Sequence, residues 1–369
     1  MPTWGELLTE LDRLQKSSKP GAAVSPQDIL RRKYLTALNK HTGRSVIVYG
    51  TAWMEGRNEI PPNALSVATG DLHGFMEACS NAKDSGHLDL IITSPGGSAE
   101  AAESIMGYLR TQFEHIRVIV PVAAMSAATM MALSADEIVM GNHSQLGPID
   151  PQFTIQTPDG PRTAPGQAII DQFEQAKIEC LDPKNIPAWV PLLRGLAPGL
   201  LAQCASARAL AEEFARRSLE AHMFAGEDDA AAKAENAAAW FANFTEFKSH
   251  GRRVSRDDAR AQGIKVLDLE DDKILQDLTL SVYHALRLTF STTPAVKVVE
   301  NHKGRAYIEQ IQQVAVQVPG TAQGQPSQPA RPVPPLGMPQ QQQPGSAFGA
   351  AANRQQRRAE SKGKGKGQS

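Results

Sequence analysis

The sequence is poor in cysteine and in aromatic residues, and its charges nearly cancel. The three cysteines, Cys79, Cys180 and Cys204, are odd in number and widely spaced, which argues against a disulfide framework and a paired-cysteine zinc site. A net charge of −1 is not that of a DNA-binding domain. The content of 41% hydrophobic and 5% aromatic residues excludes a wholly disordered chain and a multi-pass membrane protein.

A clear membrane-spanning run is also missing. Residues 118–135 include 18 positions without a charge, which is the lower limit for a span. The first part is β-branched and interrupted by Pro121, and the second part is rich in Ala, Ser and Met, so we expect a buried strand followed by a buried helix. No membrane span and no signal peptide are predicted, and a cytoplasmic location is the expectation.

Strands and helices alternate in the first half of the sequence. Apolar strands are expected at 45–50, 87–94, 115–122 and 137–141, and helices at 71–82, 98–113 and 126–135. Further helices are expected at 5–17, 25–38 and 271–290, with another strand at 295–302. The alternation predicts a parallel α/β unit.

Composition divides the chain into five expected parts. These are an N-terminal helical segment (1–43), an α/β core (44–164), an Ala-rich helical subdomain (165–250), a C-terminal part of the core (251–318) and a disordered tail (319–369). The tail has seven basic residues and one acid, a net charge of +6, so the rest of the chain carries −7. It is either a solubilising extension or a weak, salt-sensitive contact for nucleic acid or another anionic partner.

Two turns follow two adjacent predicted strands. Gly96 and Gly97 lie after the strand 87–94, and Ser126 lies after the strand 115–122. Ligand sites in open α/β sheets form at the carboxyl ends of strands, and a Gly-Gly turn lets backbone N–H groups approach a ligand closely. Taken alone, the glycines could be a simple turn and Ser126 a helix cap. Together they predict a serine nucleophile beside a backbone oxyanion hole.

The motifs LDLIITSPGGSAEAAESI and VIVPVAAMSAATMMALSADEIVMGNHSQLGPIDPQF resemble the Clp-protease/signal peptide peptidase A group of the crotonase-like superfamily. Within that group the sequence is most similar to the serine dehydrogenase proteinase family, over about residues 30–310. GRRVSRDDARAQGIKVLDLE and TTPAVKVVENHKGRAYI agree with this resemblance. It implies a Clp-protease/crotonase-like spiral of ββα units, with the helical subdomain and disordered tail added to it.

The resemblance also implies roles for single residues. Ser126 matches the nucleophile that forms an acyl-enzyme, and Gly96 and Gly97 match the glycines that bind the oxyanion and an extended substrate. The N–H of Ala127 is expected as a second oxyanion donor. The substrate would be a peptide or an unfolded protein, added as a strand beside the glycine turn. The resemblance further implies a ring-like homo-oligomer.

The general base is harder to assign. The place of the Clp-protease histidine falls near Ile149 and Asp150, neither of which is His. Signal peptide peptidases use a neutral Lys, which makes Lys177, 51 residues after Ser126, the predicted base of a Ser/Lys site. Its acidic neighbours are also those of an ordinary surface lysine.

Other side chains stay open as alternatives for the site. They are Lys184, His143, His250 and Asp150, of which Asp150 is expected to have a structural role in its turn. No cofactor and no metal site is predicted, because the sequence has no phosphate-binding loop and no paired His or Cys spacing.

Two other functions remain open. One is a catalytically inactive scaffold or peptide-binding member of the same fold, since no base is evident. The other is a crotonase-like acyl-CoA enzyme, which would use carboxylates such as Glu100 and Glu103 after the glycine turn.

Overall fold

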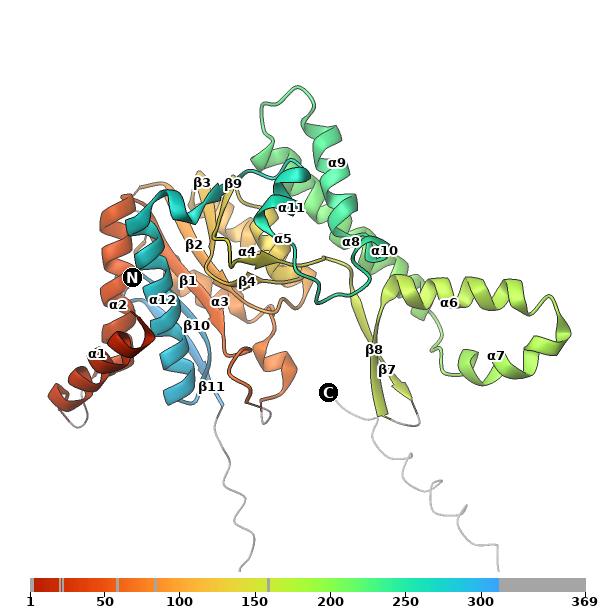
Figure 1. Ribbon diagram of the computed structural model, residues 1–369, viewed down its shortest axis with the longest axis horizontal. Helices are drawn as coiled ribbons and strands as arrows, with labels where there is room; N and C mark the ends of the chain where they lie inside the picture. Colours follow the sequence, from red (N-terminus) through yellow and green to blue (C-terminus); the bar gives the residue numbers. More distant parts are fainter. Residues whose placement is uncertain are drawn as a thin grey trace, which may run out of the picture. The chain divides into compact units, whose positions relative to one another are not determined.

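The computed structural model describes residues 3–19, 21, 23–57, 60–82, 85–157 and 160–311. The predicted tail, residues 319–369, lies outside these described residues. At the centre is a seven-stranded sheet in the order β11-β10-β1-β2-β3-β5-β9 (Figure 1). In chain order its strands are β1 (Ser45–Thr51), β2 (His87–Thr93), β3 (His115–Val120), β5 (Glu137–Met140), β9 (Val266–Asp268), β10 (Ala295–Asn301) and β11 (Ala306–Gln310).

Strand direction changes twice across the sheet, because β10 runs against both of its neighbours. The strands β1, β2, β3, β5 and β9 are parallel neighbours, whereas β10 is antiparallel to β1 and β11 is antiparallel to β10. Every residue of β1 is buried, as expected for a strand that is covered on both faces. The predicted α/β fold with a parallel unit is therefore confirmed.

Helices cover both faces of the sheet, and the pleat sends neighbouring side chains to opposite faces. One face packs on α1 (Trp4–Ser17), α2 (Pro26–Thr42) and α12 (Lys273–Thr292), with buried side chains such as Leu35, Val48 and Leu286. The other packs on α3 (Asp71–Cys79), α4 (Ala99–Gln112) and α5 (Ala127–Leu133), with buried side chains such as Tyr49, Leu90 and Met131. The site lies at the edge of this second layer.

Helix starts follow the capping signals of the sequence. Ser25 caps α2 in a capping box with Asp28, and Pro26 occupies the first helical turn. Ser255 caps α11 (Arg256–Ala261) in the same way through Asp258. Both caps have a Ser-x-x-Asp pattern in the sequence, and the cap at Ser255 fixes the start of the helix that precedes β9.

The uncharged stretch 118–135 forms the end of β3, the short strand β4 (Ala123–Ala124) and the buried helix α5, as predicted. None of the helices in the described part of the chain combines the length and apolarity that a membrane crossing requires. β4 pairs in parallel with β6 (Gln145–Leu146) and forms a second, two-stranded sheet beside the site.

Between β5 and β9 the chain leaves the central sheet. It forms a hairpin of β7 (Gln152–Thr157) and β8 (Gly160–Pro165), and Figure 1 shows α6 and α7 beyond this hairpin. The helical elements that follow are α6 (Gly166–Glu179), η2 (Pro183–Asn185), α7 (Ile186–Leu193), α8 (Leu200–Ser218), η3 (Leu219–Met223), α9 (Ala230–Phe241) and α10 (Phe244–Phe247). The remaining short turns of helix are η1 (Pro62–Leu65) and η4 (Leu269–Asp271). α11 then returns the chain to β9.

Candidate active site

Ser126 lies in a strained turn between β4 and α5. Its backbone has φ 51° and ψ −120°, and of the residues that the structure describes only Ser126 and Lys248 are non-glycine residues with positive φ. Such a conformation costs about 1–3 kcal/mol and persists where the surrounding structure imposes it, commonly at functional sites. The Ser126 side chain makes no capping hydrogen bond to α5, so the alternative role of a helix cap receives no support.

The strained turn is held by a buried side chain of α5. The hydroxyl of Thr129 donates to the carbonyl oxygen of Ala124 at 2.7 Å and accepts from the N–H of Gly147 at 2.9 Å. Thr129 is fully buried, as is most of α5. These bonds join the turn to β4 on one side and to the segment after β6 on the other, which holds the backbone around Ser126 in place.

The glycine turn packs directly against Ser126. A Cβ atom added at Gly96 would lie 2.5 Å from the carbonyl oxygen of Met125 and 2.6 Å from Cβ of Ser126. One added at Gly97 would lie 2.3 Å from the carbonyl oxygen of Val67. All three distances are below any normal contact, and Gly96 also has φ 97°. Only glycine fits at these two positions without displacing the backbone.

Two backbone N–H groups beside Ser126 have no hydrogen-bond acceptor among the described residues. Val67 pairs with the glycine turn through its N–H to Gly96 (2.7 Å) and through its carbonyl oxygen, which accepts from Ser98 (2.9 Å). This parallel pairing turns the N–H of Gly97 away from Val67. Within the described residues, neither this N–H nor that of Ala127 donates a hydrogen bond. Both donors belong to the wall of one pocket, as an oxyanion hole requires.

That pocket has a volume of about 330 Å³. Its polar side includes Ser126, Gly96, Gly97, Ala127 and His250. The apolar side is formed by Met130, Ile149, Phe153, Ala207, Leu210 and Ala211, which come from α5, the segment before β7, β7 itself and α8. The pocket therefore combines a nucleophile, backbone donors and an apolar wall.

His250 is the basic side chain that the fold brings to this pocket. Its Nδ1 lies 2.8 Å from Oδ1 of Asp150, and the Asp150 side chain is only 3% exposed. The second carboxylate oxygen of Asp150 accepts from Nε2 of Gln152 at 2.7 Å. A carboxylate on Nδ1 selects the imidazole tautomer whose Nε2 can accept a proton. The pair thus has the arrangement of a base and its orienting acid.

Long-range pairing explains how His250 reaches Asp150. Leu146 and Val254 exchange both of their backbone hydrogen bonds at 2.9 Å, which anchors the loop of His250 beside the segment that leads to Asp150. The N–H of Ile149 also donates to the carbonyl oxygen of Phe241, at 2.9 Å. The chain therefore leaves this edge of the sheet after Asp150, forms the helices between 166 and 247, and returns to the same edge at His250.

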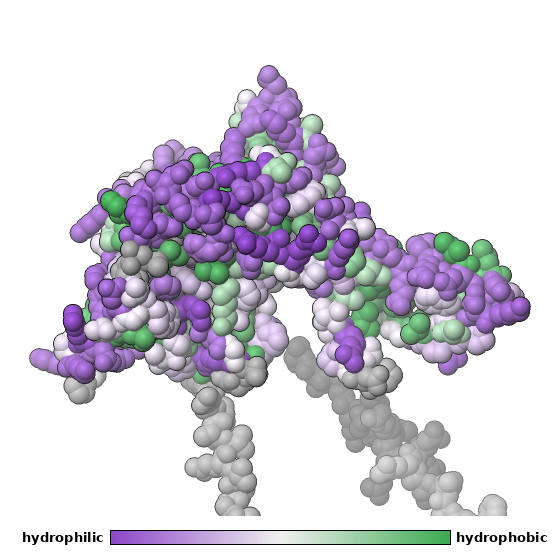
Figure 2. All heavy atoms as spheres, viewed as in Figure 1, coloured by the Kyte–Doolittle hydropathy of each residue, from purple (hydrophilic) through white to green (hydrophobic). Residues whose placement is uncertain are grey.

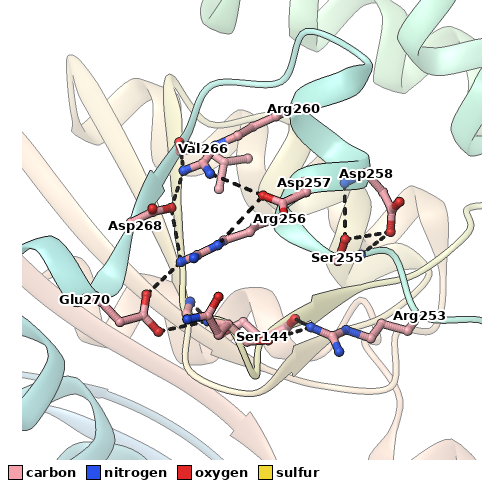
Figure 3. Close-up of polar contacts among 12 residues, drawn as sticks. Ser144, Arg253, Ser255, Arg256, Asp257, Asp258, Arg260, Val266, Asp268 and Glu270 are labelled. Carbon is pink, nitrogen blue, oxygen red and sulfur yellow. Dashed lines mark hydrogen bonds and ion pairs between the residues drawn. The ribbon is translucent and has the colours of Figure 1, made fainter.

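Charged side chains fasten the chain just after His250 (Figure 3). Arg253 donates to the carbonyl oxygen of Ser144, at 3.3 Å, and Arg256 lies 2.7 Å from Glu270 and 3.1 Å from Asp268. The Arg256 side chain is 15% exposed, so salt in the solvent screens these ion pairs less than it screens fully exposed pairs. They hold the segment after His250 against the sheet edge.

The structure does not bring Lys177 into this pocket. Lys177 lies on α6, its side chain is 58% exposed, and its Nζ pairs with Glu174 at 2.7 Å. Lys184 lies in the short helix η2, and its residue is exposed. His143 is exposed too, and neither it nor the two lysines belong to the pocket wall. The role of Lys177 as the base stays a prediction that this geometry does not support.

The two glutamates of the acyl-CoA alternative lie apart. Glu100 belongs to the pocket, where the hydroxyl of Ser98 donates to it at 2.7 Å and lowers its pKa. Glu103 instead pairs with Arg217 beside another cavity, between α4 and α8. Among the described residues, no group of three or more His, Cys, Asp or Glu side chains is placed to hold a metal ion.

Fold and turn geometry together have the parts of an α/β serine hydrolase. Residues 67–184 match the model of the ClpP-like SDH-type serine proteinase family, in agreement with the resemblance of the motifs. The matched residues include Gly96, Gly97, Ser126 and Asp150, whereas His250 lies beyond them.

Two curated relatives are uncharacterized proteins of Methanocaldococcus jannaschii. One is 43% identical over 83 residues, which are 22% of this chain and 29% of that protein. The other is 46% identical over 66 residues, 18% of this chain and 23% of that protein. The chain thus spans less than a third of the length of either relative.

A solved structure, a mutant of the 1510-N membrane-bound stomatin-specific protease, is 16% identical to this chain. The alignment covers 55% of this chain and 74% of that one, with a TM-score of 0.33. At that score the likeness says nothing about the site.

Proposed function

We propose that this protein is a serine peptidase in which Ser126 attacks the carbonyl carbon of a peptide bond. The observation that supports this most strongly is the positive-φ backbone of Ser126, packed against a glycine turn with a free N–H group. The match of residues 67–184 to a serine proteinase family supports the same chemistry. The proposal requires no cofactor.

The reaction proceeds through an acyl-enzyme. Oγ of Ser126 bonds to the carbonyl carbon while its proton passes to Nε2 of His250, and the oxyanion binds the N–H groups of Gly97 and Ala127. Collapse of the tetrahedral intermediate breaks the C–N bond, and the proton passes from His250 to the leaving amine. Water then attacks the acyl carbon and gives a proton to Nε2 of His250. The bond from that carbon to Oγ of Ser126 breaks, the carboxylic acid leaves, and Oγ takes the proton back from His250.

His250 replaces Lys177 as the base in this proposal. His250 belongs to the same pocket as Ser126 and has a buried carboxylate as its partner, while Lys177 has an exposed partner on α6. A general base must come within hydrogen-bonding reach of the proton that it removes. The site is accordingly of the Ser/His/Asp kind rather than the Ser/Lys kind that the sequence suggested.

An extended peptide is the substrate that the glycine turn would bind. Val67 occupies one side of Gly97, and the N–H of Gly97, on the opposite side, donates no hydrogen bond within the described part of the chain. A substrate strand added there would place its scissile carbonyl near Ser126. Its side chains would contact the apolar wall formed by α5 and α8.

A homo-oligomer also belongs to the proposal. Apolar side chains are exposed on α6 and α7 and between them, where Leu181 is 82% exposed, and Ile178 and Leu192 are exposed as well. Figure 2 shows hydrophobic atoms at the end of this helical pair. Exposed apolar patches mark interaction sites, and a second copy of the chain would cover this one. The cytoplasmic location and the ring form stay predictions.

The test is a peptidase assay with purified full-length protein and a pool of fluorogenic peptides. Ser126→Ala should lower kcat by about 10⁴-fold or more, because the nucleophile is lost. The matched control Ser80→Ala changes an exposed serine at the end of α3 and should leave the rate unchanged.

Equal rates for wild type and Ser126→Ala would contradict the proposal. Tight binding of peptides without cleavage would then favour the inactive scaffold. Turnover of acyl-CoA thioesters in place of peptides, lost in Glu100→Gln, would favour the crotonase-like alternative.

A further inference from the structure

A buried ion pair lies behind the glycine turn. Nζ of Lys297 is 2.8 Å from Oδ1 of Asp71, and the two side chains are 3% and 1% exposed. Lys297 comes from β10 and Asp71 begins α3, 226 residues apart in the sequence. A buried charge pair is costly to desolvate and is weak evidence for stability, so its presence beside a site calls for another explanation.

Asp71 connects this pair to the backbone that supports the glycine turn. Its Oδ2 accepts from the N–H of Ala68 at 2.9 Å. Ala68 follows Val67, whose N–H and carbonyl oxygen hold Gly96 and Ser98 at 2.7 and 2.9 Å. The carboxylate is therefore one residue away from the strand that positions Gly97.

A second connection runs through Tyr49, which lies fully buried on β1. The Tyr49 hydroxyl donates to Oδ2 of Asp71 at 2.7 Å, and its pKa is raised well above the usual value by burial and by the charge of Asp71. The Ser94 hydroxyl interacts with the Tyr49 phenol and also accepts from the N–H of Gly96 at 3.2 Å. The Gly96 end of the turn is thus connected to Asp71 through Ser94 and Tyr49, and the Ser98 end is connected to it through Val67 and Ala68.

Another buried ion pair on β10 provides a natural comparison. Glu300 is fully buried and lies 2.7 Å from Nε of both Arg31 and Arg32 of α2. It pairs in register with Val48, so it faces the opposite side of the sheet from Tyr49 and Lys297. The two pairs share a strand and a degree of burial, but only Asp71 bonds the backbone of Ala68, next to the residue that holds the glycine turn.

We propose that Asp71, held by Lys297 and Tyr49, is a positioning residue that sets the Gly96–Gly97 turn for oxyanion binding. This inference rests on the proposed peptidase function. Preorganised donors contribute to the transition state without contributing equally to substrate binding. Loosening the turn should therefore affect kcat and leave KM almost unchanged.

The test compares two variants with two matched controls. Tyr49→Phe removes one hydroxyl and Asp71→Asn removes the charge, while Tyr283→Phe and Glu300→Gln make the same changes at buried positions away from the turn. We expect kcat to fall about tenfold or more in the first two variants, with KM within about twofold. The controls should keep their kcat even where their melting temperatures fall.

Binding separates positioning from general loss of structure. A peptide boronate, which forms a tetrahedral adduct with Ser126, should bind Tyr49→Phe and Asp71→Asn about tenfold more weakly. The peptide without the boronate should be measured on proteins that carry Ser126→Ala. It should bind Tyr49→Phe and Asp71→Asn in that background as tightly as it binds Ser126→Ala alone. Hydrogen exchange at the Ser98 amide, which bonds Val67, should be faster in Asp71→Asn than in Glu300→Gln.

Three outcomes would overturn the inference. Unchanged kcat in folded Tyr49→Phe would do so, and so would an equal fall of kcat in Glu300→Gln. A wild-type protein without Ser126-dependent turnover would overturn the proposed function and this inference together. The exchange rate of the Ser98 amide distinguishes the cases, because it reports the support of the turn whether or not the protein is a peptidase.

Discussion

His250 and Lys177 are both basic side chains far along the chain from Ser126, but the fold places them in different surroundings. His250 belongs to the pocket wall and has a buried carboxylate partner, whereas Lys177 is exposed on α6 and pairs with a neighbour on its own helix. The residue with the more suggestive spacing is the one outside the pocket. Proximity in the fold, and not separation in the sequence, decides which side chain can act on Ser126.

The same contrast separates the two regions that carry these residues. Around Ser126 the backbone is fixed by buried bonds, such as those of Thr129, and by close packing at Gly96. On α6 and α7 many side chains are exposed, and α7 buries none. Catalytic geometry needs the first kind of environment, while the second suits contact with another chain.

The largest effect on this comparison is expected from His250→Ala. Without a base, kcat should fall by about 10³–10⁴-fold, since a positioned general base supplies most of that factor. His143→Ala, at an exposed position outside the pocket wall, serves as the matched control. A His250→Ala protein that retains full activity would remove His250 from the site.

Asp150→Asn should come next. The amide can still approach Nδ1 of His250, but it no longer stabilises the imidazolium and can select the wrong tautomer, so kcat should fall by about 10²–10³-fold. Steady-state kinetics would show this as a change in kcat with little change in KM. Activity equal to that of the parent would assign Asp150 the purely structural role first expected for it.

Gly96→Ala tests the glycine turn, whereas the two previous variants test the base. The added methyl group would press on Met125 and Ser126, and the residue would keep a strained φ, so the oxyanion donors should shift. A fall in kcat of about 10²-fold is expected. Gly107→Ala is the matched control, because a Cβ there meets open space on α4. Equal activity of both variants would contradict the close packing described for the turn.

Lys177→Ala should have the smallest effect. An exposed ion pair contributes about 0–1 kcal/mol, and the side chain lies outside the pocket. Activity within about twofold of the parent is the expectation, with Lys184→Ala measured alongside. A large loss of kcat in Lys177→Ala alone would restore the Ser/Lys assignment and imply that α6 reaches the site in an assembly.

Much of the fold could be predicted from local patterns. The apolar strands at 45–50, 87–94 and 115–122 alternate with helices, and the patterns that predict both depend on neighbours in the sequence. The direction of β10 could not be read in this way, because a strand pattern is the same for parallel and antiparallel pairing. The β7–β8 hairpin could not be predicted from the sequence, since its strands are largely polar and only partly buried.

The site was predictable in the part that is local. The Gly96–Gly97 turn and Ser126 follow adjacent strands, so strand order was enough to bring them together. His250 is 124 residues beyond Ser126 and reaches the site only through the pairing of Leu146 with Val254. The one signal in the sequence was Asp150, at the place where Clp proteases have their histidine, and it does not indicate where its partner lies.

The most direct test of the account is labelling by a fluorophosphonate probe, with the modified residue mapped by mass spectrometry. With His250 as the base, Ser126 should be labelled rapidly in the parent and in Lys177→Ala; Ser126→Ala should not be labelled, and labelling of His250→Ala should be slower by at least about 10²-fold. A folded parent protein that is not labelled would contradict the claim that Ser126 is an activated nucleophile. Labelling that depends on Lys177 and not on His250 would contradict the assignment of the base.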